Sequence, residues 1–175
     1  MREGGRDIAV LLRERAKKLA RREQSDAGVE SEPLVIFSIG GQCFGLPLAG
    51  VVYAARLQHL TPIPRAASHY LGLTWMGGYL VTVLDAAALL GLRDGRLRDV
   101  TTCVIGSCGS RQLGFGAEQI VGIEDVPASQ ITPLPPSDPQ ERGAARLAFL
   151  GTGRAFLLDL GQLLARLDAG EAVRH

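Results

Sequence analysis

The chain has 175 residues, 46% of them apolar, with 22 glycines, nine prolines and a formal net charge of +1. This length fits one ordinary domain or two small fused ones, and the apolar share is large enough for a buried core. Because the net charge is close to zero, the composition argues against a polyanion-binding surface over the whole protein.

Basic residues are concentrated at the N-terminus, where residues 1–24 carry eight of the nineteen basic side chains and four acidic ones. Apolar residues recur there at three- and four-residue spacing, which predicts an amphipathic helix followed by a polar linker to residue 31. Three roles remain open: packing on the body, docking on a partner or targeting, and binding a membrane surface or nucleic acid. Interspersed acids and missing aromatic anchors disfavour the last role.

Localisation is predicted from the apolar segments and the cysteines. The N-terminus shows no apolar core followed by a small-residue cleavage site, and the longest apolar runs are only strand-length. Cys43, Cys103 and Cys108 are odd in number and lie in apolar or glycine-rich contexts, as reduced thiols do. We therefore expect a cytoplasmic protein without direct membrane insertion.

From Pro33 onward the pattern is that of short strands joined by tight turns. Strands are expected at 34–39, 42–48, 51–57, 71–76, 79–84, 100–105, 112–117, 119–125, 146–150 and 155–158. A polar, proline-rich loop is expected at 133–143, and short helices after Asp85 and Asp159. Ten or so short strands with local hairpins favour small closed barrels over a sandwich.

Residues 83–90 and 157–164 repeat one pattern at an offset of 74: an apolar strand, an aspartate and a helix with a leucine pair. Asp85 and Asp159 are predicted to be helix N-caps, because their carboxylates can accept hydrogen bonds from the first helical turn. Fainter parallels precede each copy, at offsets of 66, 69 and 69: Ile39-Gly40, Phe44-Gly45 and Val51-Val52 against Ile105-Gly106, Leu113-Gly114 and Ile120-Val121. The sequence therefore predicts a duplicated β-module.

The sequence offers little for catalysis. No serine or cysteine lies in a nucleophile-elbow motif to act with His59 or His69, and Cys103 and Cys108 lack partners at metal-ligand spacing. Residues 106–109 lack the Gly-Lys-Ser/Thr ending of a phosphate-binding loop. We predict no catalytic, cofactor-binding or metal-binding residue. The missing catalytic set disfavours a small enzyme, and the missing basic stripe disfavours a nucleic-acid-binding barrel.

One tight turn gathers aromatic side chains and a methionine: Trp75, Met76, Gly77, Gly78 and Tyr79. Such residues dominate protein interfaces when they are exposed. Core packing between the modules is the alternative. Because strand side chains alternate, only part of this set can face outward.

The ordered set of motifs between Pro33 and Leu167 resembles the CheW family. The matching segments are residues 34–40, 44–48, 61–64, 70–73, 80–85, 113–116, 121–123 and 131–133. The resemblance implies a mainly β fold of two intertwined, five-stranded SH3-like barrels with short helices. The residue pattern adds an N-terminal helical extension, the helix and linker at 1–31, which the simplest family members lack. The resemblance further implies a CheW-like domain at 32–168, with strand-exchanging modules at about 33–95 and 96–160, and a tail at 169–175.

The CheW resemblance also implies a function. Family members are not enzymes and need no cofactor. They are chemotaxis adaptors that bridge the cytoplasmic tip of a chemoreceptor to the regulatory domain of a CheA-type histidine kinase, itself a CheW-like module. We therefore expect these partners, and other CheW-like proteins, at membrane-associated receptor arrays that the protein reaches through its partners.

Two positions depart from the family pattern. Where the family has Asn-Leu-Arg-Gly, this chain has Trp75-Met76-Gly77-Gly78, and a family glutamate corresponds to Tyr53. Losing the arginine removes a fixed fork of hydrogen-bond donors. A scaffold without kinase coupling, dedicated to one other partner, is therefore the alternative function. The candidate interaction residues are Tyr53, Trp75, Met76, Gly77, Gly78 and Tyr79, with Leu113 and Phe115 on the second module.

Overall fold

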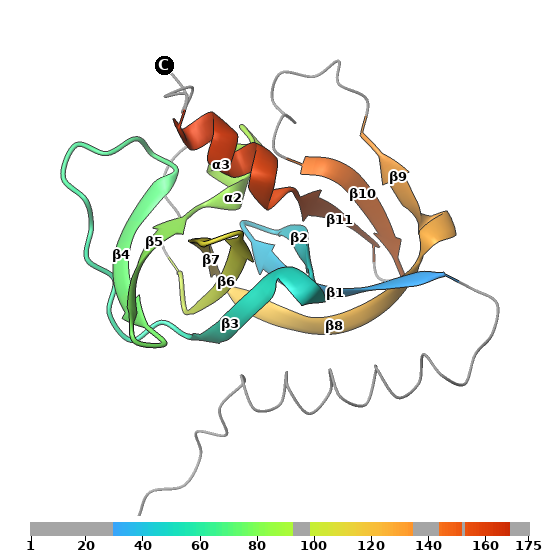
Figure 1. Cartoon of the computed structure of the whole chain (residues 1–175), viewed down its shortest axis with the longest axis horizontal. Helices are drawn as coiled ribbons and strands as arrows, with labels where there is room; N and C mark the ends of the chain where they lie inside the picture. Colours follow the sequence, from blue (N-terminus) through green and yellow to red (C-terminus); the bar gives the residue numbers. More distant parts are fainter. Residues whose placement is uncertain (1–29, 93–98, 135–143, 152, 169–175) are drawn as a thin grey trace, which may run out of the picture.

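A computed structural model describes residues 30–92, 99–134, 144–151 and 153–168, and its strands form two sheets (Figure 1). The elements are β1 (Ser31–Ile39), β2 (Gln42–Pro47), η1 (Leu48–Gly50), β3 (Val51–Arg56), β4 (Tyr70–Met76), β5 (Tyr79–Leu84), α2 (Ala86–Leu89), β6 (Thr102–Cys108), β7 (Arg111–Ala117), β8 (Gln119–Pro127), η2 (Ala128–Gln130), β9 (Ile131–Pro133), β10 (Ala144–Leu150), β11 (Gly153–Leu158) and α3 (Leu160–Asp168). The predicted N-terminal helix, most of the proline-rich loop and the C-terminal tail lie outside the described residues.

Each half of the chain contributes strands to both sheets. One sheet has the order β8-β1-β2-β11-β10-β9 and the other has the order β3-β6-β7-β5-β4. The β1–β2 hairpin thus joins strands of the second half, and the β6–β7 hairpin joins strands of the first half. The mainly β fold of two SH3-like barrels that exchange strands is confirmed.

The duplication is visible in the strand register. β7 runs parallel to β5 with Gly114 opposite Val83, and β2 runs parallel to β11 with Gly45 opposite Leu157. Gly45 and Gly114 are 69 positions apart, and Val83 and Leu157 are 74 apart, as the sequence predicts. The same pair of contacts therefore joins the exchanged hairpin to its host sheet in both barrels.

The predicted match of Ile39-Gly40 to Ile105-Gly106 is wrong by three residues. Phe37 pairs with Phe44, and Gly106 pairs with Leu113, so Phe37 and Gly106 are the equivalent positions, again 69 apart. Gly40 lies in a hairpin turn, whereas Gly106 lies inside a strand. The shared dipeptide therefore has a different place in each hairpin.

The larger sheet has six strands instead of the five predicted. The sixth strand, β9, pairs with β10 through Thr132 opposite Leu147 and its two neighbours. In the first half, Thr61 makes only an isolated bridge with Leu73, at the equivalent place beside β4. The two proline segments therefore pair with the equivalent strands β4 and β10, but only the second one does so as a regular strand.

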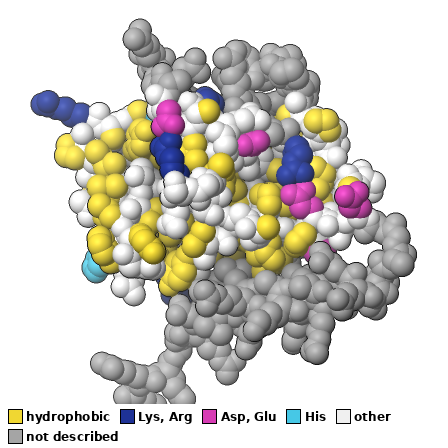
Figure 2. All heavy atoms as spheres, viewed as in Figure 1, with side chains coloured by type: hydrophobic (Ala, Val, Ile, Leu, Met, Phe, Trp, Pro, Cys, Tyr) yellow, Lys and Arg dark blue, Asp and Glu magenta, His cyan; other side chains and the backbone are white. Residues whose placement is uncertain are grey.

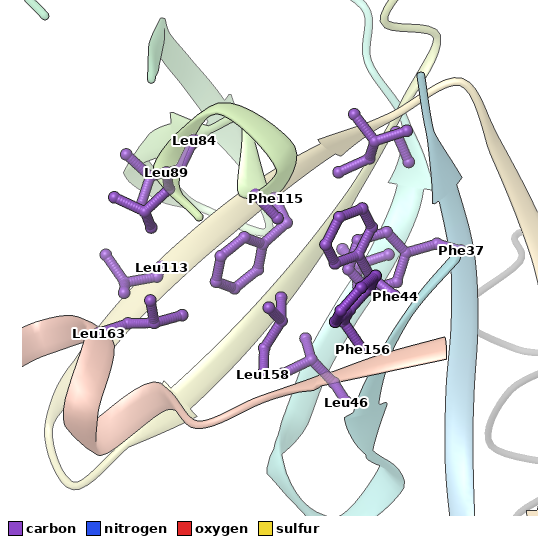
Figure 3. Close-up of a cluster of buried hydrophobic side chains, with 14 of the residues drawn as sticks. Phe37, Phe44, Leu46, Leu84, Leu89, Leu113, Phe115, Phe156, Leu158 and Leu163 are labelled. Carbon is purple, nitrogen blue, oxygen red and sulfur yellow. The ribbon is translucent and has the colours of Figure 1, made fainter. Parts of the chain in front are cut away.

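The core consists of one central cluster between the sheets and one smaller cluster on each sheet. Four phenylalanine rings form a continuous row through the central cluster (Figure 3). Phe115 of β7 lies 6.3 Å from Phe37, which lies 6.1 Å from Phe44, which lies 5.9 Å from Phe156, between ring centroids. Since Phe115 belongs to one sheet and the other three to the second, the row joins the two barrels.

Hydrogen bonds link Glu30 and Glu32 to other parts of the described chain. The Ala128 amide donates to the Glu30 carbonyl at 2.8 Å. The Glu32 carboxylate accepts hydrogen bonds from Nη1 and Nη2 of Arg146, at 2.6 and 3.0 Å, and so links β1 to β10. Ser31 is therefore part of the first strand and not of a linker.

We expect a chain without residues 1–29 to unfold in a single cooperative transition, because both strand ladders and the Glu32–Arg146 pair remain. Removal of residues 1–33 should lower the melting temperature further, since it leaves Arg146 without its carboxylate. Thermal unfolding followed by circular dichroism measures the cooperativity and the melting temperature of each deletion variant. A non-cooperative melt of the shorter deletion would contradict this division of the chain.

His69 is fully buried, and neither of its ring nitrogens has a hydrogen-bond partner among the described residues. Its ring lies 4.4 Å from that of Tyr70. Burial lowers the pKa of His69 below its ordinary value, the charge of Arg166 lowers it further, and the carboxylate of Asp85 opposes both. The neutral imidazole is therefore the form that the native fold favours.

We expect the stability of the protein to fall as the pH falls below about 6.5, the ordinary pKa of histidine. In that range the unfolded chain binds a proton at His69 that the native state does not, so acid shifts the equilibrium towards unfolding. Urea unfolding at pH 7 and at pH 5.5 should show the loss, and the His69→Leu variant should show a smaller one. Equal losses in both proteins would contradict a role for His69.

Candidate protein-interaction surface

The β4–β5 hairpin closes with the two-residue turn Gly77-Gly78. Both glycines have positive φ angles, +60° and +86°, which define a type I′ turn. A Cβ atom at either position would meet nothing within 4 Å. The turn is therefore open to solvent, and the backbone conformation is what favours glycine there.

Beside the turn lie the three most exposed large apolar side chains of the described residues. Trp75 is 71% exposed, Tyr79 is 64% exposed and Leu80 is 61% exposed. Trp75 lies directly opposite Leu80 in the hairpin, so their side chains leave the same face of the sheet. We call Trp75, Tyr79 and Leu80 the hairpin patch.

The hairpin patch lies in uncharged surroundings. Residues 70–84 contain no Asp, Glu, Lys or Arg, and β4 is the last strand in its sheet order. In Figure 2, hydrophobic and uncharged side chains dominate the side of the molecule where Figure 1 places β4 and β5. Edge strands usually carry charges that discourage association, so an uncharged, aromatic edge hairpin is typical of a surface covered by a partner.

Three of the predicted interaction residues are buried, and for these side chains the prediction is wrong. Met76 packs in the smaller cluster of its sheet, and Leu113 and Phe115 pack in the central cluster. Met76 follows Trp75, so strand alternation points it inward. Leu113 and Phe115 lie on β7, which has neighbours on both sides and presents these residues to the interior.

Tyr53 is half-buried on β3, at the other end of the strand order of the five-stranded sheet. It packs against the same small cluster that holds Met76, and so supports the inner side of the hairpin. The structure thus exposes Trp75, Gly77, Gly78 and Tyr79 around one turn, with Trp75 and Tyr79 on opposite faces of the hairpin.

Four large, exposed apolar residues of the described chain were not among the predicted interaction residues: Val52, Leu80, Val121 and Phe149. Leu80 belongs to an apolar run that predicts a buried strand, but its position opposite Trp75 across a two-residue turn is the signal that could have found it. Phe149 is exposed in the β10–β11 hairpin, opposite Arg154. It lies 74 positions after Trp75, so the repeat itself relates the two aromatic positions.

Asp85 and Asp159 both occupy N-cap positions. Asp85 Oδ1 accepts a hydrogen bond from the Ala88 amide at 3.1 Å, and Asp159 Oδ1 accepts one from the Gln162 amide at 2.9 Å. Asp85 is fully buried, whereas Asp159 is half-exposed. Their carboxylates stabilise the starts of α2 and α3 and are not part of the hairpin patch.

The remaining reactive groups form no common site in the described part of the chain. Burial raises the pKa of the Cys103 thiol to about 12, which keeps it protonated. A cavity of about 250 Å³ between β6, β11 and α3 is lined by Arg146 and Asp159, whose charged groups already bond Glu32 and Gln162. Among the described residues, no three His, Cys, Asp or Glu side chains are grouped as metal ligands would be.

The described residues include no helix that is long and apolar enough to span a membrane.

Comparison with known proteins identifies relatives of this fold. The family model of the CheW-like domain matches residues 33–168. Protein FrzA of Myxococcus xanthus is 31% identical over 99 residues, which make up 57% of this chain and 62% of FrzA, so the match spans less than two thirds of that relative. The crystal structure of the scaffolding protein TtCheW from Thermoanaerobacter tengcongensis covers 75% of this chain and 90% of its own, with a TM-score of 0.64. At 18% sequence identity, this likeness shows the fold alone.

We expect Asp85→Ala and Asp159→Ala each to lower the free energy of unfolding by about 0.5–2 kcal/mol, because a helix loses its cap. Asn should retain most of the stability at Asp159, because its amide oxygen can still accept the capping hydrogen bond from the Gln162 amide. Urea unfolding measures the changes. If Asp85→Ala were fully stable but bound no partner, the aspartate would belong to an interface instead.

Proposed function

Because the chain belongs to the CheW-like family of scaffolds, we propose that it is a non-enzymatic adaptor that couples a chemoreceptor to a CheA-type histidine kinase. The similar fold of a scaffolding protein supports this proposal. On this proposal the regulatory domain of the kinase, the receptor tip and other CheW-like proteins are the partners, and the protein works in the cytoplasm at receptor arrays.

The hairpin patch is the observation that carries the proposal. It exposes one Trp, one Tyr and one Leu on an edge hairpin without charge. Trp75 and Leu80 lie on the outer face of the hairpin, whereas Tyr79 stands opposite Met76 on the other face, at the exposed end beside the turn. Burial of their exposed apolar area in a complex would contribute free energy in proportion to the area covered. Binding through such a patch should depend only weakly on salt.

The turn geometry favours a second candidate, a scaffold dedicated to one partner without kinase coupling. The resemblance places a signalling arginine at the position of Gly77, and the φ angle of Gly77 is +60°. A side chain other than Gly, Asn or Asp is disfavoured in that region of backbone space. The hairpin therefore differs from an arginine-bearing turn in its backbone as well as in its side chain.

Charge gives no support to a nucleic-acid partner. The described residues hold six arginines, no lysine and nine acidic residues. Arg146 is paired with Glu32, and Arg111 lies 2.5 Å from Asp168. Among the described residues, no row of basic side chains lies beside the exposed aromatic side chains, as it does in β-barrels that bind single-stranded nucleic acid.

We expect Trp75→Ala to weaken binding of the regulatory domain of the CheA-type kinase from the same organism by more than tenfold, or about 1.4 kcal/mol. Titration calorimetry at two salt concentrations measures this, and the weak salt dependence should appear in the wild type. Trp75 is the only tryptophan, so its fluorescence should also shift to shorter wavelength when the partner covers it.

Phe149→Ala is the matched control, because it removes an exposed aromatic side chain at the equivalent position of the other barrel. Its affinity should stay close to that of the wild type. If neither the kinase domain nor the receptor tip binds the wild type, the dedicated scaffold remains as the function. If Phe149→Ala weakens binding and Trp75→Ala does not, the contact lies on the second barrel.

A further inference from the structure

The side of the molecule that carries β3 and β8 lies opposite the two helices (Figure 1). α2 and α3 cover the central cluster with buried residues such as Leu89 and Leu163. On β3 and β8 and the turn before β3, the residues that pack against this cluster are only partly buried: Leu48, Val51, Ile120 and Ile123. With Val52 and Val121, we call these residues the β3–β8 face.

Two β-bulges make this face more apolar than regular strands would. β3 carries an extra residue between the pairs Val51–Gly106 and Tyr53–Ile105, and β8 carries one between the pairs Ile120–Phe37 and Gly122–Ile36. The extra residues are Val52 and Val121, which lie 69 positions apart in the repeat. They are 50% and 45% exposed, respectively. A bulge places successive side chains outside the ladder, and both copies use it to expose valine.

We propose that residues 6–23 of this same chain dock on the β3–β8 face as an amphipathic helix, with their leucines against Val52 and Val121. The proposal does not depend on the adaptor function.

The point where the chain enters the body supports this occupant. Ser31 pairs with Pro127 at the end of β8, and the Glu30 carbonyl accepts the Ala128 amide. A linker of seven residues, 24–30, can span at most about 25 Å. A helix of eighteen residues is about 27 Å long, and the nine residues of β8 span about 30 Å. A helix that folds back along β8 therefore reaches the whole face.

Charge supports the same occupant. Residues 1–24 carry a net charge of +4, from eight basic and four acidic side chains. Between Gln112 and Leu134 the chain has three acidic residues, Glu118, Glu124 and Asp125, and no basic one. Arg56, at the end of β3, is the one basic residue on the strands of this face. Since the tether keeps the two charge clusters close, their attraction acts at high effective concentration.

Hydrogen–deuterium exchange of the full-length protein tests the proposal. We expect amides of residues 8–20, 48–53 and 119–125 to exchange at least tenfold more slowly in the wild type than in Leu12→Asp and Val121→Asp. Phe149→Asp is the matched control, because Phe149 is 49% exposed and Val121 is 45% exposed. That variant should leave the protection intact. Circular dichroism melts establish that each variant is folded.

A charge exchange gives a second, independent measurement. Glu124→Lys with Asp125→Lys should release residues 8–20, and adding Arg13→Glu with Lys17→Glu should restore their protection. Exchange of residues 8–20 at the rate of an unstructured peptide would overturn the proposal. So would protection that disappears on dilution, which would mean docking on a second copy, or protection that requires vesicles of anionic lipid.

Discussion

The row of phenylalanines through the central cluster is the interaction on which the rest of the structure depends. Because the first hairpin of each half pairs with strands of the other half, neither sheet can form from one half alone. Phe37 and Phe44 lie on the exchanged β1–β2 hairpin, Phe115 lies on the exchanged β6–β7 hairpin, and Phe156 lies on β11, which pairs with β2. The contacts between these rings link the two exchanged hairpins, so that burial of one hairpin requires burial of the other. The fold is therefore expected to be cooperative. The elements at the surface, including the hairpin that carries the hairpin patch, are positioned by this central cluster.

At equivalent positions near this row of phenylalanines, the two halves of the chain carry side chains of opposite size. Leu160, at the start of α3, packs over Gly106, where an added Cβ would lie 2.7 Å from a leucine methyl. The equivalent positions of the other half hold Ala86 and Phe37, both fully buried. One half thus packs a large helix residue on a small strand residue, and the other half holds a small helix residue and a large strand residue at the equivalent positions. Close packing tolerates such paired changes better than single ones, which is how copies of one module can diverge and still share a core.

The sequence could predict what local chemistry determines. The aspartate caps, the glycine turns and the 74-residue repeat follow from short motifs, and they led to the correct fold class. The match of Ile39-Gly40 to Ile105-Gly106 failed because a dipeptide does not record whether its glycine lies in a turn or inside a strand. The candidate site was partly predictable: alternation separates Trp75 from Met76 once the turn is fixed. Leu113 and Phe115 could not be assigned, because the strand exchange that surrounds β7 with neighbours depends on contacts distant in the sequence.

The equivalent hairpins of the two barrels show how the copies came to differ in surface chemistry. In β4–β5, Trp75 stands opposite Leu80, and the pair is wholly apolar. In β10–β11, Phe149 stands opposite Arg154, whose guanidinium carbon lies 6.0 Å from the centroid of the Phe156 ring. A partner that covers the first pair gains free energy mainly from apolar burial, whereas one that covers the second must also satisfy or displace a cation. Because specificity is a difference between affinities, this single charge is enough to make a partner prefer one hairpin over the other. A duplicated fold with identical ends could not distinguish two partners, whereas these two hairpins differ by one charge at equivalent positions.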